Sequence, residues 1–310
     1  MTAAPSPDAP QHYLGGIALR LLAMISLSLM FVVVKLVAEA GIHLVESLFW
    51  RQALVLPFVI AWAATHGGIA TLKTRRIGAH ARRAMMGLVG MACNFGGMIL
   101  LPMAEATTIN LSVPIFAVIF AALLLGERTG WQRWSAVIVG FVGVLVVLDP
   151  VSGFAGGFGG DHGLGTLIAM AGAVMTALIT IAVRDLGRTE SAGTTVFWFS
   201  LVSMIPLGIA LPFVYVPHGL YEWLLLFALG FLGAVVQLSL TGALRLAPVS
   251  VVIPMDYSAL LWSIACGWWF FGTLPAETTW IGAPLIVASG LFIAWREHRR
   301  HIERPKEVAA

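Results

Sequence analysis

Charged residues are scarce in this chain, and their scarcity decides its class. Only 11% of the residues are Asp, Glu, Lys or Arg, and 59% are hydrophobic. A soluble domain carries about 25% charged residues, so a water-soluble fold is excluded. Cysteine is scarce as well. Cys93 and Cys266 both lie within apolar runs and share no ligand spacing, which argues against a disulfide framework or a zinc site.

Enzyme motifs are also missing. The chain contains no GxSxG, no HExxH and no Walker-type GxxxxGK[ST] motif. We therefore expect no enzyme activity, no cofactor and no metal. No nucleic acid partner is expected either, because Lys and Arg are dispersed at the ends of apolar runs and form no single basic face. Six histidines are expected in solvated loops or tails: His12, His66, His80, His162, His298 and His301.

What the chain does contain is a series of ten apolar runs between residues 14 and 295. Crossing a bilayer takes about 20 apolar residues in a helix. The predicted spans are Leu14–Leu36, Ser47–Thr65, Ala84–Leu101, Ala104–Leu125, Trp131–Leu148, Leu164–Val183, Thr194–Val216, Tyr221–Gly242, Ala247–Phe271 and Thr279–Trp295. The first run is too long for a signal-peptide core, so no cleavage is expected. The predicted class is an all-α membrane protein with about ten transmembrane helices.

The basic residues predict the orientation of these helices. They fall in alternate gaps: Lys73, Arg75, Arg76, Arg82, Arg83, Arg128, Arg133, Arg184, Arg188, Arg245 and the C-terminal Arg296, Arg299, Arg300, Arg304 and Lys306. The opposite gaps hold only Lys35, near the end of the first helix. Because Lys and Arg in short loops are retained on the cytoplasmic side, both termini are predicted to be cytoplasmic.

An internal repeat divides the chain into two halves. The segment LPMAEATTINLSVPIFAVIFAALLLGER from Leu101 is similar in pattern to ALRLAPVSVVIPMDYSALLWSIACGWWFFGTLP from Ala243, with Pro114 matched to Pro254. The predicted repeats cover residues 14–148 and 164–295, between tails 1–13 and 296–310. Five helices per repeat is an odd number, so the second copy enters the membrane from the opposite face. This inverted-repeat arrangement is typical of alternating-access transporters.

These residues carry a resemblance to a known family. The chain resembles the drug/metabolite transporter superfamily, in its ten-helix branch with two EamA-type repeats. The resemblance covers nearly the whole chain, and its most specific parts are Pro114, the Leu125–Gly126–Glu127–Arg128 ending, and Pro254 with Asp256 and Tyr257. The second repeat departs from the family's glutamate ending, since Phe271, Gly272 and Thr273 stand there.

The resemblance implies secondary transport of small organic solutes across the cell inner membrane, most often export of amino acids or related metabolites. The implied partners are a small-molecule substrate, the lipid bilayer and a proton or other coupling ion; the oligomeric state stays open. Two alternatives remain. One is uptake of a vitamin or nucleoside-like compound, which the many Trp and Phe residues also suit. The other is a lipid-handling membrane protein or a scaffold that transports nothing.

Asp256 is the leading candidate for the substrate site. An ionised carboxylate inside a span costs about 2.5–3.5 kcal/mol on insertion scales, so it should face protein or water. It can couple protons, balance a substrate amine, or cap broken backbone beside Pro254. Tyr257 and Trp262 follow it and present faces suited to a flat or cationic solute. Packing is the alternative reading for both aromatic residues.

The remaining candidates lie in the second and fourth spans. Asn110 and Thr108 belong to a polar entry before Pro114 that can bind substrate or join helices. Arg51 can attract a substrate carboxylate or extend to the outer headgroups. Pro114 and Pro254 each remove an N–H and are candidate hinges, with a static kink as the alternative. Gly126, Glu127 and Arg128 are interpreted as a structural motif at the end of the fourth helix.

Overall fold

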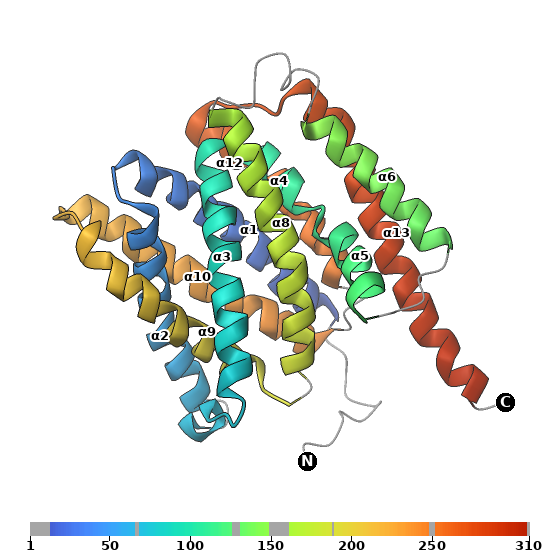
Figure 1. Cartoon of the computed structure of the whole chain (residues 1–310), viewed down its shortest axis with the longest axis horizontal. Coiled ribbons are helices and arrows are strands. Elements are labelled where there is room, and N and C mark those ends of the chain that lie inside the picture. Colours follow the sequence, from blue (N-terminus) through green and yellow to red (C-terminus); the bar gives the residue numbers. More distant parts are fainter. Residues whose placement is uncertain are drawn as a thin grey trace.

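The computed structural model is a bundle of helices (Figure 1), described for residues 13–65, 68–125, 131–148, 161–187, 189–247 and 252–308. No strand lies among these residues. The first half contains α1 (Tyr13–Glu39), α2 (Leu44–Thr65), the 3-10 helix η1 (Ile69–Leu72), α3 (Ile77–Leu100), α4 (Met103–Asn110), α5 (Val113–Leu125) and α6 (Trp131–Leu148). The second half contains α8 (Asp161–Leu186), α9 (Ala192–Ala210), η2 (Leu211–Phe213), α10 (Leu220–Leu246), η3 (Ile253–Tyr257), α12 (Ser258–Phe271) and α13 (Glu277–Val308).

The helices reproduce the ten predicted spans. Seven segments are long and apolar enough to cross a membrane by length and composition: α1, α2, α3, α4 with α5, α8, α9 and α10. Shorter apolar stretches occur in α6, at Trp134–Val147, and in α13, at Glu277–Ile293. The segment η3 with α12 supplies the remaining span. The prediction of an all-α membrane protein is confirmed.

Several helix ends differ from the sequence prediction, and three of the differences are informative. Helix α3 begins at Ile77 instead of Ala84, so Arg82 and Arg83 are helical and do not lie in a loop. Helix α9 ends at Ala210, before the predicted limit of Val216, and α13 continues past Trp295 to Val308. Hydropathy marks the part of a helix that suits lipid, whereas backbone hydrogen bonds continue the helix regardless of side-chain charge.

The two halves are related by an approximate two-fold axis. Helix α1 packs against α10, and its counterpart α8 packs against α3, the counterpart of α10. The pairs α2 with α9 and α6 with α13 each join counterparts, and the fourth and ninth spans meet through α4 and α12. Exchanging the halves therefore preserves the main helix contacts named here. Since each half crosses the membrane an odd number of times, the repeats are inverted.

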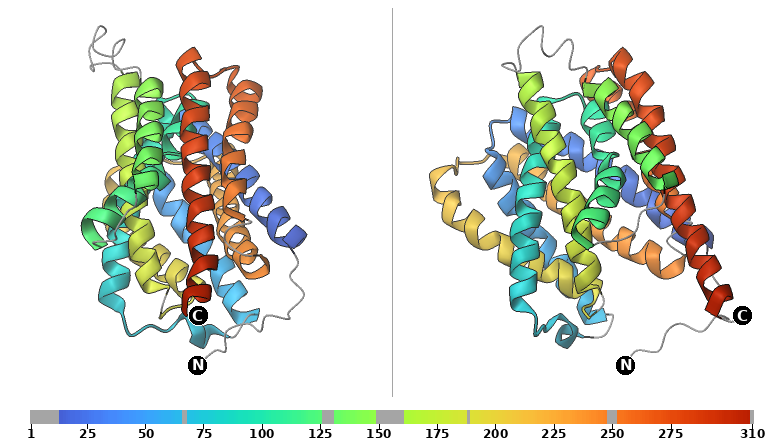
Figure 2. Two further views of the ribbon diagram at one scale, coloured as in Figure 1. Left: turned by 90° about the vertical axis from the view of Figure 1, so that its right-hand side faces the viewer. Right: turned by 45° about the vertical axis from the view of Figure 1, so that its right-hand side comes forward.

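Glycines allow the outermost pair of helices, α6 and α13, to approach closely. Figures 1 and 2 show these two helices side by side along their length. A Cβ at Gly282 of α13 would lie 2.6 Å from the carbonyl oxygen of Gly143 of α6, and a Cβ at Gly143 would lie 2.9 Å from that of Gly282. Helices in lipid have no hydrophobic driving force for association, so close van der Waals packing at small residues stabilises the contact instead.

The breaks in the fourth and ninth spans position the site. Helix α4 ends at Asn110, and α5 restarts at Val113, one residue before Pro114. Pro254 likewise stands in the first turn of η3, before α12. A proline at the start of a helix lacks only an N–H that has no partner there, so each proline suits a restart and not a continuous helix. The interruptions that the prolines predict are present.

The outer surface is apolar over much of its extent. Phe213, Leu123 and Trp269 are 86%, 71% and 76% exposed, which in water would create a strong drive to aggregate but suits contact with lipid tails. Buried apolar side chains form the main core where the central helices meet: examples are Leu48, Met98, Leu101, Met103, Ile109 and Ile115.

Candidate functional site

The two broken spans contact each other. The hydroxyl of Thr107 in α4 lies 2.7 Å from that of Ser263 in α12, and both side chains are buried. The break after α4 is held by local bonds: the backbone N–H of Ser112 donates to the carbonyl of Ile109 at 3.0 Å, and the Ser112 hydroxyl donates to the same oxygen at 2.5 Å. The two irregular segments, which sequence reasoning singled out, therefore come together through α4 and α12.

Asp256 forms an ion pair that sequence reasoning missed. Its two carboxylate oxygens accept from Nε and Nη2 of Arg20 at 2.5 and 2.6 Å. The Arg20 side chain is 12% exposed and that of Asp256 33%. This fork geometry is the strongest form of a charge-assisted hydrogen bond. Arg20 lies within the apolar run of α1, about 10 Å from Tyr13 along the helix axis. A charged residue at such a position indicates a partner in the protein interior, and this was the signal in the sequence that could have identified Arg20.

A hydrogen-bonded pair of side chains joins α4 to α8. His162 Nε2 lies 2.9 Å from Glu105 Oε2, with the histidine side chain 66% exposed and the glutamate 10%. Sequence analysis assigns His162 to a solvated loop; the structure places it in the first turn of α8 and gives it this partner. Neither Glu105 nor the pairing was predicted.

Both pairs connect the two halves of the protein. The first joins α1 to η3 and the second joins α8 to α4, so each connects one half of the protein to the other. Arg20 lies near the face where α1 begins, which we call the Tyr13 face. Glu105 and His162 lie at the starts of α4 and α8, at the opposite face, which we call the Glu39 face. Each face therefore carries one polar pair between the halves, an ion pair at the Tyr13 face and a hydrogen-bonded pair at the Glu39 face.

Asn110 takes part in a chain of hydrogen bonds at the centre of the bundle. Its Nδ2 donates to Asn94 Oδ1 at 2.8 Å, and Asn94 Nδ2 donates to Thr176 Oγ1 at 3.1 Å. The chain links α4, α3 and α8. By contrast, the hydroxyl of Thr108 is fully buried and donates to the carbonyl of Ala104 in its own helix. The structure thus brings Asn110 together with Asn94 and Thr176, and gives Thr108 a local role.

The aromatic candidates lie away from this chain. A Cβ at Gly290 of α13 would overlap the Tyr257 hydroxyl, so the tip of that ring rests against α13. Trp262 is 38% exposed on α12, and no interaction joins it to Asp256 within the described residues. Gly126, Glu127 and Arg128 lie outside the described residues.

Arg51 is buried between helices. Its side chain is 7% exposed, which does not fit the alternative of a guanidinium reaching the headgroups. Nη1 donates to Gln52 Oε1 at 2.9 Å, and the same oxygen accepts from the Ser200 hydroxyl of α9 at 3.3 Å. Arg83 of α3 stacks on Phe199, the preceding residue of α9, with Cζ 4.1 Å from the ring centroid. One turn of α9 therefore contacts Arg83 directly and Arg51 through Gln52.

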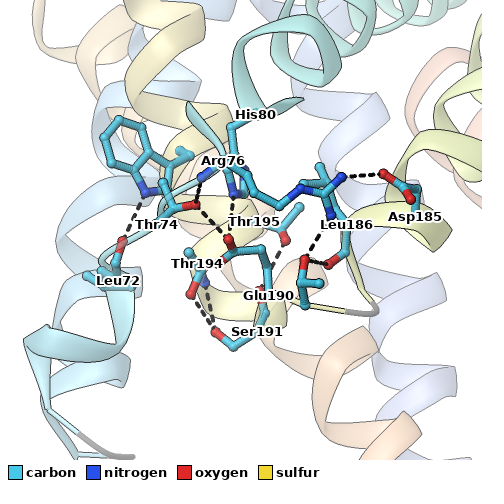
Figure 3. A network of polar contacts seen from close by, with 12 residues as sticks. Leu72, Thr74, Arg76, His80, Asp185, Leu186, Glu190, Ser191, Thr194 and Thr195 are labelled. Atoms are coloured by element: carbon cyan, nitrogen blue, oxygen red, sulfur yellow. Dashed lines mark hydrogen bonds and ion pairs between the residues drawn. The ribbon is translucent and has the colours of Figure 1, made fainter. Parts of the chain in front are cut away.

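A network of polar contacts lies at the Tyr13 face, near these arginines (Figure 3). The Thr74 hydroxyl donates to Glu190 Oε1 at 2.6 Å, and His80 Nε2 lies 3.9 Å from the same oxygen. Arg76 donates to Asp185 at 2.7 Å. His80 is completely buried, contrary to the expectation of a solvated loop histidine, because α3 begins earlier than hydropathy predicts. The network ties the α2–α3 connection to the α8–α9 connection.

Two further charged groups have structural roles at the Glu39 face. Lys35 Nζ donates to the carbonyls of Met98 and Leu101 at 2.9 Å each, at the end of α3, where a cation is favoured by the helix dipole. His218 Nε2 lies 2.6 Å from Glu46 Oε1, and both side chains are buried. Among the described residues, no group of three or more His, Cys, Asp or Glu side chains could hold a metal ion.

Broken helices in contact, inverted repeats and polar side-chain pairs between the halves at both faces define a transporter-type polytopic membrane protein. The profile of the EamA-like transporter family matches residues 14–149 and 163–295. The chain belongs to this family, and it is a membrane transporter.

Relatives align with nearly the whole chain. A riboflavin transporter of Rhizobium johnstonii is 32% identical, covering 94% of each chain. An S-adenosylmethionine uptake transporter of Rickettsia felis is 30% identical, covering 94% of this chain and 96% of its own. A pseudopaline exporter of Pseudomonas aeruginosa is 27% identical, covering 88% and 94%. A solved crystal structure with 21% identity and a TM-score of 0.61 covers 91% of this chain and 95% of that chain; it shows the fold alone.

Proposed function

We propose that this protein is a secondary active transporter that moves a small organic metabolite across the cell inner membrane by alternating access. The observation that carries the proposal is the placement of two polar pairs between the halves. Arg20 with Asp256 joins the halves near the Tyr13 face, and Glu105 with His162 joins them at the Glu39 face. Opening either face by moving the halves apart breaks one pair and leaves the other in place.

Asp256 has a defined role in this proposal. Its carboxylate holds the Tyr13 face closed through Arg20, and it is released when that face opens. In the open state it is free to take a proton or to bind a substrate cation, which are the two chemical roles that the sequence suggests. Pro114 and Pro254 are the proposed hinges, because backbone breaks can absorb a change in helix direction. The Tyr13 face is the proposed cytoplasmic side, which the basic residues of the α2–α3 connection support.

The substrate is proposed to be of amino-acid or cofactor size. The family resemblance favours export of amino acids or related metabolites. The similarity to transporters named for riboflavin and S-adenosylmethionine favours uptake of a ring-bearing metabolite as the second candidate. Alternating access itself is reversible, so the gradient and the coupling ion set the direction.

Solute counterflow tests the proposal without knowledge of the coupling ion. The full-length protein is reconstituted in liposomes preloaded with unlabelled riboflavin, S-adenosylmethionine or an amino acid mixture, and the labelled compound is added outside. We expect transient accumulation of at least one labelled compound. Absence of counterflow for every compound, together with scrambling of labelled phospholipid, would overturn the proposal in favour of a lipid-handling protein.

A further inference from the structure

The strongest unexplained feature is a group of buried hydrogen-bond donors with no acceptor. Arg51 Nε, Gln52 Nε2, and Arg83 Nε and Nη1 are all inaccessible to solvent and have no partner among the described residues. They belong to α2 and α3 and lie beside the same turn of α9, where Gln52 contacts Ser200 and Arg83 stacks on Phe199. Arg51 Nη1 and the Ser200 hydroxyl donate to the same Gln52 oxygen at 2.9 and 3.3 Å, and Ser200 directly follows Phe199, so both guanidinium groups lie near this turn of α9.

No counter-charge accompanies these arginines. Within the described ranges, none of the ion pairs includes Arg51 or Arg83. The acid of this region is Glu190, and it is engaged by the Thr74 hydroxyl and by neighbouring His80. Buried charges without partners cost several kcal/mol each, and two like charges together cost more. A fold that retains both is expected to use them for a bound anion.

The chemistry of the donors indicates which anion. Guanidinium groups present paired N–H donors that match the two oxygens of a carboxylate or phosphate. The amide nitrogen of Gln52 adds a neutral donor, and the Phe199 ring fixes the plane of Arg83. The Ser203 hydroxyl, one helical turn from Phe199, is also buried without a partner. Donors dominate the site, as binding of an oxyanion requires.

We propose that Arg51 and Arg83 form a subsite for an oxyanion, carboxylate or phosphate, of the transported metabolite, with Gln52 as an additional donor. The subsite rests on the proposed transport function. It predicts that a metabolite with an acidic group binds better than the same metabolite without it. It also predicts that the positive charges of Arg51 and Arg83 destabilise the protein when no ligand is bound.

Thermal unfolding of the purified full-length protein in a neutral detergent tests the subsite. The first probes are sodium acetate and inorganic phosphate, each compared with sodium chloride at equal ionic strength. The second probes are matched pairs: S-adenosylmethionine with its decarboxylated form, and riboflavin 5′-phosphate with riboflavin. Ligand binding to the native state raises Tm with concentration. We expect acetate or phosphate to stabilise, and the acidic member of at least one pair to bind about tenfold more tightly.

Three variants separate binding from folding. Arg51→Gln and Arg83→Gln should abolish the oxyanion effect, and Arg51→Gln should leave the Tm of the empty protein equal or higher, because a buried charge is removed. Arg82→Gln removes the neighbouring exposed arginine and should retain the effect. A purely structural arginine would instead give a lower Tm in the empty Arg51→Gln protein.

The proposal is overturned if the anions do not raise Tm and the acidic member of each pair binds no more tightly than its partner. It is also overturned if both Arg51→Gln and Arg83→Gln retain the anion effect on Tm. Stabilisation by phosphatidylglycerol micelles alone, lost in the same variants, would assign the arginines to a lipid headgroup and overturn the substrate subsite. If counterflow is observed but anions do not raise Tm, the subsite is rejected and the proposed transport function is retained. An anion effect without counterflow retains the binding site but removes its role in transport.

Discussion

Arg20 of α1 and Asp256 of η3 join the two halves of the protein through a bidentate ion pair, with N–O distances of 2.5 and 2.6 Å. Asp256→Asn leaves the guanidinium, which is mostly buried, without a counter-charge. Loss of one partner of a fully buried pair costs about 3–5 kcal/mol. The one-third exposure of Asp256 lowers our expectation to about 1–2 kcal/mol. Thermal unfolding should show the lower stability, and counterflow should fall at least tenfold.

Exchange of the two charges is the control for this pair. The double variant Arg20→Asp with Asp256→Arg should recover much of the lost stability if the pair acts as an inter-half contact. Arg82→Gln, which removes an exposed charge, should change neither measurement. Full counterflow in Asp256→Asn would contradict the role assigned to the pair.

The contact between α6 and α13 should tolerate no side chain at Gly282. A Cβ there meets the backbone oxygen of Gly143, which cannot rotate away, so Gly282→Ala should cost about 1–3 kcal/mol. Gly78→Ala is the matched control, because a Cβ at Gly78 of α3 meets nothing within 4 Å. Alanine in a helix is favoured over glycine by about 0.5–1 kcal/mol. Thermal unfolding should therefore move in opposite directions for the two variants.

Asn94 should contribute more than either of its partners, because both of its hydrogen bonds join different helices, whereas Thr176 also donates within its own helix, to the carbonyl of Gly172. Each such bond between membrane helices contributes about 0.6 kcal/mol, so Asn94→Leu should lose about 1 kcal/mol and Thr176→Val about half of that. Unfolding of the single variants and of the double variant measures the coupling. Equal effects of both single variants would show that Asn94 does not bridge Asn110 and Thr176.

The network at the Tyr13 face contains strong and weak contacts. The side chains of Arg76 and Asp185 are 35% and 52% exposed, and such pairs contribute about 0–1 kcal/mol. Glu190 is 11% exposed and accepts from Thr74, so its replacement leaves buried donors without an acceptor. We expect Glu190→Ala to lower Tm clearly and Asp185→Ala to change it little. A larger decrease in Tm on replacement of Asp185 than on replacement of Glu190 would show that the exposed pair supplies most of the stabilisation.

Sequence patterns predicted the spans and the broken helices because these depend on local properties. Runs of apolar residues and the prolines at 114 and 254 act within a few turns of the chain. The inverted repeat was also accessible, since it follows from the odd number of spans in each half.

Partners across the bundle could not be predicted in the same way. Arg20 and Asp256 are separated by 236 positions, and nothing in one sequence assigns the one to the other. Arg83 and His80 were placed in a loop because a hydropathy limit was taken for a helix limit. A guanidinium inside a span, at Arg20 or Arg51, was the signal that a charge is used in the interior.

Accessibility of position 111, between α4 and α5, tests the central claim most directly. Cys93 and Cys266 are first replaced by serine, Leu111→Cys is introduced, and a membrane-impermeant thiol reagent is applied from each side of sealed vesicles. Glu105→Gln weakens the pair at the Glu39 face and should increase labelling from that side; Asp256→Asn should increase labelling from the Tyr13 side. Opposite shifts are the predicted result. Labelling from one side alone in all three proteins would contradict alternating access.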